Sequence, residues 1–313
     1  MGKGAMEQGK LKITVIVVTF KGKRWYKQCF GSLRQSTIPV EIIVVDNASN
    51  DGTVEYLKEQ FPEIQLIALQ ENLGFGRANN MAMRYALDHG CDYVFLLNQD
   101  AWIEPDTLEK LIDIHQRHSE YGILGPVQVN AEKTKVLDGV IQFLINPDNV
   151  NKQMFSDFVM GSIDEVYPVA EISAAAWLLP RNTLETVGGF DPIFMHYGED
   201  WNYLSRVLYH ELKVGLTPHV HVVHDCVEQV ERPEGFAMDF DKWLLLRASD
   251  LLYPDTIVDD MIRQYRRTAL LKLLTLHKAT FKENWESYRY LKKNKSRIEL
   301  SRAQNKSIGL NWL

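Results

Sequence analysis

The sequence contains no long hydrophobic run and no recognisable targeting segment. The longest aliphatic stretch near its start, residues 13–18, is short and includes Thr14, whereas about 18 apolar residues are needed to span a bilayer. No basic segment followed by an apolar one opens the chain, and Met6 occupies the position where a myristoylation signal needs Ser or Thr. We therefore expect neither a membrane-spanning helix nor a signal peptide nor an N-terminal lipid anchor.

Cysteine is scarce as well. The three cysteines, Cys29, Cys91 and Cys226, are odd in number and widely separated, which excludes a disulfide framework and favours a reducing compartment. Hydrophobic residues make up 45% of the 313 residues and charged residues 24%, so wholesale disorder is excluded. The sequence predicts a cytoplasmic protein with one large domain or two smaller ones.

Charge is unevenly distributed along the chain. Residues 261–313 carry 13 Lys or Arg against three Glu, whereas the remainder carries 22 basic against 38 acidic residues. The acidic body predicts no binding to nucleic acid, because that needs a basic face to neutralise phosphates. The basic tail predicts peripheral contact with an anionic membrane at its inner face, and a solvated helix face is the equal alternative.

Leucines are interspersed with the basic residues between 270 and 276. On a helix they would cover more than half of the circumference, so we expect this stretch to be partly buried against the body or against another subunit of a homo-oligomer. Downstream, four basic residues predict a dense positive patch: Lys292, Lys293, Lys295 and Arg297.

The chain between residues 11 and 118 alternates short β-branched runs with amphipathic stretches. Strands are predicted at 13–18, 41–46, 64–69 and 92–98, and helices at 25–33, 51–61, 75–89 and 104–118. Apolar runs without alternation indicate a parallel sheet that is covered on both faces. The fold class is therefore α/β, and residues 1–10 are interpreted as a tag or a disordered terminus.

The remainder of the chain is less regular. Strands are predicted at 122–129, 172–180, 213–217 and 219–225, with a loop around 146–156 and a helix after Gly198. Beyond residue 236 the pattern becomes helical to the end. The sequence thus predicts an α/β domain over 11–235 and a basic helical extension over 236–313.

Polar residues follow each of the first four predicted strands. Ligands bind outside the carboxyl ends of the strands in an open parallel sheet, and these ends carry Thr19, Phe20, Asp46, Asn72, Asn98 and Asp100. The turn at 72–80 adds Gly74 and Arg77 before a helix, which suits a phosphate or diphosphate. Neither the dinucleotide-binding fingerprint nor a Walker loop is present.

Six motifs in this order resemble the family 2 glycosyltransferases, and their rhamnosyltransferase-like branch in particular. They cover residues 11–228 and read ITVIVVTF, EIIVVDNASNDGT, ENLGFGRANN, LLNQDAWIEPD, WLLPRNTLETVGGFDPIFMHYGEDWNYLSR and VHVVHD. The resemblance implies a GT-A type nucleotide-binding fold with a mostly parallel central sheet. It also implies a UDP- or dTDP-linked sugar donor, a Mg²⁺ or Mn²⁺ ion, and inverting transfer to a saccharide or lipid-linked acceptor in bacterial surface polysaccharide assembly.

The resemblance also implies roles for single residues on the donor side. Thr19 and Phe20 would border the nucleobase, and Asp46 would accept a hydrogen bond from it. Three residues would lie along the ribose and diphosphate: Asn72, Gly74 and Arg77. The segment 98–100 occupies the position of the family's D-x-D motif, with Asn98 in place of the first Asp. The implied metal ligands are Asp100 and His224.

On the acceptor side the resemblance implies Asp200 as the base that takes the acceptor's proton. Glu199 and Trp201 would contact the acceptor, and the GGFDP turn at 188–192 would present their loop. Trp177 would line the floor of the sugar pocket, or it would be ordinary core packing.

Two other functions remain open at this point. A sugar nucleotidyltransferase would need a Gly- and Arg-rich loop after the first strand, which residues 21–24 resemble weakly. A non-catalytic membrane-associated binding module would use the basic tail, but it would have no use for acidic residues gathered at one rim of the sheet.

Overall fold

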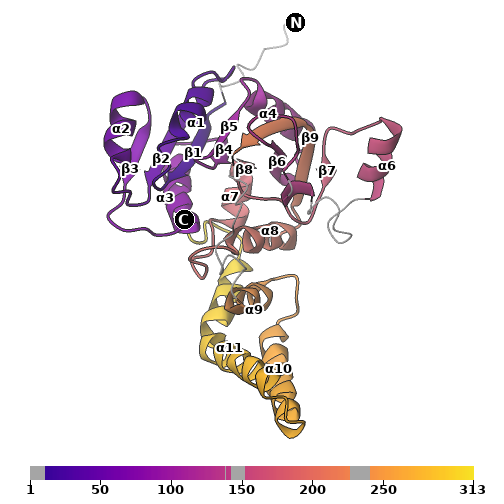
Figure 1. Cartoon of the computed structure of the whole chain (residues 1–313). Helices are drawn as coiled ribbons and strands as arrows, with labels where there is room; N and C mark the ends of the chain where they lie inside the picture. Colours follow the sequence, from indigo (N-terminus) through magenta and orange to yellow (C-terminus); the bar gives the residue numbers. More distant parts are fainter. Residues whose placement is uncertain (1–10, 138, 142–151, 226–239) are drawn as a thin grey trace, which may run out of the picture.

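The computed structural model describes residues 11–137, 139–141, 152–225 and 240–313 (Figure 1). Residues 1–10, interpreted above as a tag or a disordered terminus, lie outside this range. The predicted boundary at 235 does so as well. The division into two domains therefore stays a prediction.

The first half of the sheet is parallel, as the apolar runs predicted. Its four strands stand in the order β3-β2-β1-β4; they are β1 (Ile13–Thr19), β2 (Glu41–Asp46), β3 (Gln65–Ala68) and β4 (Tyr93–Leu97). Aliphatic side chains of β1 and β2 are buried on both faces of the sheet. This explains why their sequences show no apolar–polar alternation.

Helices cover both faces of the whole sheet (Figure 1). One face is packed by α1 (Tyr26–Leu33), α2 (Thr53–Gln60) and α4 (Thr107–Arg117). The other face is packed by α3 (Phe75–Asp88), α7 (Arg181–Val187) and α8 (Glu199–Tyr209). The result is a three-layered α/β body.

The second half of the sheet is mixed. It contains β5 (Ala101–Ile103), β6 (Tyr121–Val129), β7 (Tyr167–Pro168), β8 (Ala176–Pro180) and β9 (Lys213–His224). β8 lies antiparallel between β4 and β6, β9 runs parallel to β6, and β5 and β7 run antiparallel to β9. Most strands, namely β1 to β4, β6 and β9, thus share one direction.

Two predicted elements are wrong. The two short strands expected at 213–217 and 219–225 are one strand, β9, whose pairing with β6 shifts register between Thr217 and His221. Pro218 falls within this irregularity, where its missing N–H is not required. The loop expected at 146–156 is helical from Lys152, at the start of α6 (Lys152–Met160); in α6, Asp157 accepts a hydrogen bond from the Tyr167 hydroxyl at 2.8 Å.

The helical extension consists of α9 (Phe240–Ser249), α10 (Ile257–Leu274) and α11 (Lys278–Asn305). α10 and α11 form an antiparallel hairpin whose turn is the part of the extension farthest from the sheet (Figure 1). The leucines between 270 and 276 are exposed, so the expected burial against the body is wrong. Among the described residues, no helix is both long and apolar enough to cross a bilayer.

The extension is attached to the body through the turn at 188–192. Asp191 in this turn is only 2% exposed, and its carboxylate accepts hydrogen bonds from Ser301 and from Asn305 (2.7 Å) of α11. Its other oxygen accepts from the backbone N–H of Ile193 at 2.8 Å. One buried carboxylate therefore links the end of α11 to the loop that precedes α8.

The same turn is held by the body. The Asn80 side chain of α3 donates to the Phe190 carbonyl and accepts from the Phe190 N–H, both at 2.7 Å. From α8, Tyr203 donates to Gly188 at 2.9 Å and the buried Arg206 donates to Gly189 at 2.6 Å. The turn is thus fixed from three helices at once.

We expect Asp191→Ala to lower the free energy of unfolding by about 3–5 kcal/mol, because three buried donors would lose their acceptor at about 1–3 kcal/mol each, partly offset by relaxation. Urea unfolding measures this. Asp113→Ala, an exposed carboxylate on α4, is the control and should change the value by less than about 0.5 kcal/mol. An Asp191→Ala variant as stable as the control would contradict the role of this turn.

Candidate active site

The carboxyl ends of β1 and β2 are joined by a buried carboxylate. Thr19 donates to Asp46 at 3.0 Å, and the backbone N–H of Ser49 donates to the second oxygen of Asp46 at 2.9 Å. The next residue, Asn47, accepts from the backbone N–H of Leu73 at 2.8 Å. Thr19 and Asp46 are therefore brought together, as their positions predicted, but both are buried below the surface of the rim. Each Asp46 oxygen already accepts one hydrogen bond. A bond from a nucleobase would have to use a second lone pair of one of these oxygens.

Phe20 is exposed at the edge of this rim and is held through its backbone. Gln99 accepts from the Phe20 N–H at 2.9 Å and donates to the Phe20 carbonyl at 3.1 Å. This two-way pairing fixes the segment 98–100 against the end of β1. Asn98 is fixed at the same time, because its N–H donates to Ala175 at 2.9 Å.

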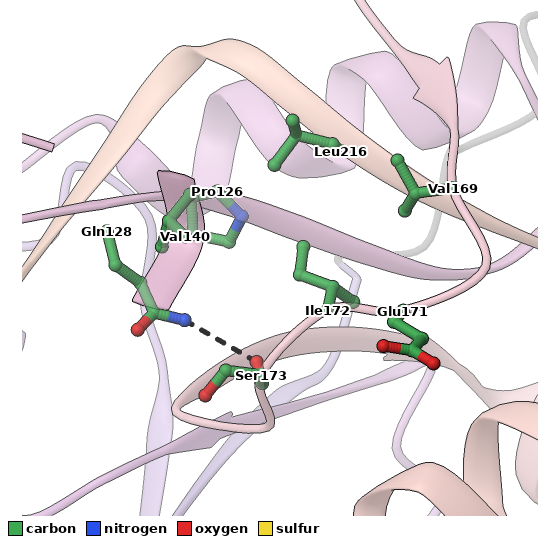
Figure 2. A pocket seen from close by; sticks show the side chains of 8 residues that line it. All are labelled: Pro126, Gln128, Val140, Val169, Glu171, Ile172, Ser173 and Leu216. Atoms are coloured by element: carbon green, nitrogen blue, oxygen red, sulfur yellow. Dashed lines mark hydrogen bonds between the residues drawn. The ribbon is translucent and has the colours of Figure 1, made fainter. Parts of the chain in front are cut away.

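Asp100 and His224 face each other across neighbouring antiparallel strands, since Ala101 of β5 pairs with His224 of β9. His224 Nε2 lies 3.4 Å from Asp100 Oδ1, and His224 Nδ1 lies 2.9 Å from the Gln128 side-chain oxygen. The Gln128 amide nitrogen points to the Ser173 carbonyl (Figure 2). In this orientation Gln128 accepts from Nδ1–H, which leaves Nε2 as the ring nitrogen that faces Asp100.

This pair fits a divalent cation. Ligand atoms about 3 Å apart are typical of neighbouring positions around an octahedral ion with bonds of about 2.1 Å, and a hydrogen bond that fixes the tautomer is usual for a metal-binding histidine. Within the described ranges, no cluster of three or more His, Cys, Asp or Glu side chains could hold a metal by itself. An ion at Asp100 and His224 would therefore need oxygens from water or from a bound phosphate.

Gly74 and Arg77, predicted to lie along the ribose and diphosphate, contact the segment at 192–195. Gly74 has φ +82, and a Cβ there would lie 2.1 Å from the Met195 carbonyl oxygen, so the close backbone approach that glycine permits is to the 195 segment. Arg77 donates to the Pro192 carbonyl at 3.1 Å, and Asn72 accepts from the N–H of Gly74 at 2.9 Å. The turn at 72–80 therefore positions the loop before α8.

That loop delivers two carboxylates to a cavity at this end of the sheet. Tyr197 (φ +63) and Gly198 (φ +99) both have left-handed backbone conformations, after which α8 begins with Glu199 and Asp200. The cavity has a volume of about 600 Å³, within the usual range for ligand sites. Its lining comprises Phe75, Asn98, Ser173, Ala174, Ala175, His196, Tyr197, Glu199, Asp200 and Lys242.

Burial raises the pKa of both carboxyl groups. Glu199 is 7% exposed and one of its oxygens has no hydrogen-bond partner; burial, reinforced by the charge of Asp200, raises the pKa of Glu199 to about 7, against the smaller opposing effect of Lys242. Burial also raises the pKa of Asp200, although its hydrogen bond from the N–H of Trp201 at 2.9 Å acts in the opposite direction. Carboxyl groups in such surroundings are suited to accept a proton near neutral pH.

The two tryptophans lie elsewhere. Trp177 is fully buried in β8 and packs on Phe190 and Tyr203, so it belongs to the core and does not line the cavity. Trp201 follows Asp200 on a helix, which directs its side chain to another face. It stacks on Trp243 at 5.8 Å in a separate cavity of about 180 Å³.

Some residues of the site were not found from the sequence. Gln128 orients His224, and its only signal was a polar residue in the otherwise apolar strand β6. Lys242 comes from α9, which the sequence assigned to the extension. Lys242 lines the cavity because the extension packs against the body. The local sequence around Lys242 gives no sign of this packing.

Solved structures share this fold. S. aureus TarS 1-349 in complex with UDP-GlcNAc matches with a TM-score of 0.58 and 15% identity, over 95% of this chain and 90% of that one. Mannosyltransferase PcManGT from Pyrobaculum calidifontis, in complex with GDP-Man and Mn2+, matches with a TM-score of 0.52 and 18% identity, over 95% and 74%. These likenesses confirm the GT-A fold.

Sequence comparison gives the family. N-acetylglucosaminyl-diphospho-decaprenol L-rhamnosyltransferase of Mycobacterium tuberculosis is 25% identical over 207 residues, which is 60% of this chain and 67% of that protein. The family model for Glycosyl transferase family 2 matches residues 14–174 of this chain. The resemblance of the six motifs is thereby confirmed, and the chain belongs to glycosyl transferase family 2, with its rhamnosyltransferase-like members as relatives.

Proposed function

We propose that this glycosyltransferase moves a sugar, with inversion, from a UDP- or dTDP-linked donor to a hydroxyl group of a saccharide or lipid-linked acceptor. The observation that carries the proposal is the cavity in which Asn98, two residues before Asp100, lies with Glu199 and Asp200. A nucleotide at the strand ends would place its sugar between these two groups. The family match favours this function over a nucleotidyltransferase or a non-catalytic module.

Asp200 is the proposed base. As the acceptor oxygen forms its bond to the anomeric carbon, the Asp200 carboxylate takes the hydroxyl proton, and the bond from the anomeric carbon to the nucleoside diphosphate breaks with its electron pair on the phosphate oxygen. Desolvation makes the carboxylate more basic, which helps it to take this proton. Glu199, beside it in the cavity, would hold a sugar hydroxyl.

Asp100 and His224 are the proposed metal-binding residues. A Mg²⁺ or Mn²⁺ ion bound there would neutralise the charge that develops on the departing diphosphate. Gln128 keeps His224 in the orientation and tautomer that such binding needs. The bound Mn2+ of the PcManGT structure supports this proposal by analogy of fold.

The nucleobase is proposed to lie at the ends of β1 and β2, against the exposed ring of Phe20 and next to Thr19 and Asp46. Asn72 lies beside this edge, where we propose that it contacts the ribose. Because Gly74 and Arg77 contact the 192–195 segment, we propose that they act on the donor through the loop that carries Asp200. The named activity of the mycobacterial relative favours a deoxyhexose as the sugar and a lipid-linked acceptor, as in surface polysaccharide assembly.

Replacing Asp200 tests the base. Asp200→Asn should reduce transfer by about two orders of magnitude or more and should retain donor binding, because the amide has the same shape but does not take a proton. Nucleotide release during transfer or slow hydrolysis of the donor measures the first quantity, and calorimetry measures the second. Asp113→Asn on α4 is the control. Turnover equal to that of the unaltered protein would exclude Asp200 as the base.

Replacing Asp100 tests the metal site. Asp100→Ala should weaken nucleoside diphosphate binding in Mn²⁺ by at least about tenfold, as loss of metal-site residues typically does, whereas Asn98→Asp should be tolerated. Excess chelator should abolish transfer. Asp106→Ala, which removes a surface salt bridge to Lys110, serves as control. An Asp100→Ala variant whose nucleotide binding still increases on addition of Mn²⁺ would place the ion elsewhere.

The raised pKa of Glu199 predicts a pH-dependent stability. Its pKa rises from 4.5 to about 7 on folding, so the folded state holds the proton more tightly and loses stability as pH increases through this window. Glu199→Gln removes this cost and should be more stable than the unaltered protein at pH 8 by about 3 kcal/mol, with no difference near pH 4. Urea unfolding at both pH values measures it.

Glu55→Gln is the matched control, because Glu55 also lies in the first turn of a helix but is exposed. It should show no such pH-dependent gain. If Glu199→Gln is equally stable or less stable at pH 8, the carboxyl group is not desolvated as described.

A further inference from the structure

The hairpin of α10 and α11 ends in an exposed apolar surface. This leucine tip consists of five side chains: Leu270, Leu271, Leu273, Leu274 and Leu276. The two at the turn, Leu274 and Leu276, are 80% and 81% exposed. Exposed apolar side chains gathered at one end of a folded protein usually mark an interaction site.

The turn itself carries a leucine where glycine is favoured. Leu276 has φ +59, a left-handed conformation that costs a branched side chain energy and is usually filled by Gly or Asn at the end of a helix. The helix end closes with hydrogen bonds from Leu276 to Leu273 at 3.2 Å and from His277 to Lys272 at 3.0 Å. A strained, exposed leucine contributes nothing to the packing of this chain, so its side chain is available for an outside contact.

Basic residues flank the leucine tip in the sequence. Between Asp260 and Glu283 the chain has no Asp or Glu. It has six cations there: Arg263, Arg266, Arg267, Lys272, Lys278 and Lys282. Two of the six pair within the hairpin, Arg263 with Asp260 and Lys282 with Glu286 at 3.9 Å. Two residues of the predicted downstream patch are also used internally, since Lys295 pairs with Asp259 at 2.6 Å and Arg297 donates to Ile193 at 2.9 Å.

An aromatic cluster follows on α11. Phe281 stacks with Trp285 at 6.0 Å, and Trp285 lies 5.0 Å from Tyr288. At 1.5 Å per residue these rings begin about 8 Å along the hairpin from Leu276. Apolar side chains at the end, cations beside them and aromatic rings above match the successive layers of a membrane interface.

We infer that the leucine tip docks into the surface of an anionic lipid bilayer, with the leucines among the acyl chains and the neighbouring cations at the headgroups. A second copy of the chain fits this surface less well, because each copy would bring the same excess of positive charge to the contact. An anionic headgroup layer instead complements them. The binding itself does not depend on the proposed function. Its role does, because docking would bring the enzyme to a lipid-linked acceptor.

The hairpin also fixes the distance between bilayer and active site. α11 runs without interruption from Lys278 at the tip to Ser301 and Asn305, which hold Asp191 beside the catalytic loop. At 1.5 Å per residue this spans about 35 Å to Ser301 and about 40 Å to Asn305. A hairpin standing upright on the bilayer would therefore hold the turn at 188–192 at about this height above the tip.

Vesicle co-sedimentation tests the docking. The full chain should bind mixed phosphatidylcholine–phosphatidylglycerol vesicles, weakly bind pure phosphatidylcholine vesicles, and lose binding at high salt. Leu274→Ser/Leu276→Ser should reduce binding to the mixed vesicles at least about tenfold. Lys272→Glu/Lys278→Glu should remove the preference for phosphatidylglycerol. Leu300→Ser/Ile308→Ser is the matched control, because these side chains are 68% and 75% exposed away from the tip and should leave binding unchanged.

A single variant separates docking from folding. Leu276→Gly relieves the left-handed strain, so its melting temperature should equal or exceed that of the unaltered protein while its vesicle binding falls. Unchanged vesicle binding by Leu274→Ser/Leu276→Ser and by Leu276→Gly would overturn the inference. So would a lipid-free dimer that the leucine changes dissociate. Hydrolysis of nucleotide-sugars without lipid should be the same in all tip variants, and its absence in every protein would refute the proposed function while leaving the vesicle result intact.

Discussion

The burial of the Asp191 carboxylate in the turn at 188–192 is the constraint on which the site depends. A buried carboxylate must be satisfied by hydrogen bonds, and here its donors come from α11 and from the loop before α8. The turn that carries it is clamped by Asn80 and Arg206. The extension is therefore part of the scaffold that holds the cavity, and Lys242 of α9 even lines it.

The site separates two kinds of acidic residue by their surroundings. Asp100 lies at a polar strand end, where its carboxylate faces His224 and can hold a cation. Glu199 and Asp200 lie in a desolvated cavity that raises the pKa of both. Carboxyl groups whose environments differ in this way take different chemical roles within one site. The roles proposed for them, metal binding for Asp100 and proton uptake for Asp200, follow this difference.

Much of this could be predicted from the sequence, because buried parallel strands and the polar residues at their ends follow simple patterns. The runs at 13–18 and 41–46 and the residues Thr19, Asp46 and Asp100 are of this kind. The rest depends on tertiary contacts that leave no local signal. Gly74 faces a backbone carbonyl of a distant segment, β9 continues through Pro218 because its partner shifts register, and Gln128 acts through a histidine on another strand.

The central claim is that a metal-bound diphosphate at Asp100 and His224 lies opposite the acidic pair of α8. Anomalous diffraction from crystals grown with Mn²⁺ and UDP or dTDP tests it most directly. The account predicts one strong Mn²⁺ peak in contact with Asp100, His224 and the diphosphate, with the open side of the cavity leading to Asp200. A peak bound by Glu199 and Asp200, or a nucleotide away from the ends of β1 and β2, would contradict it.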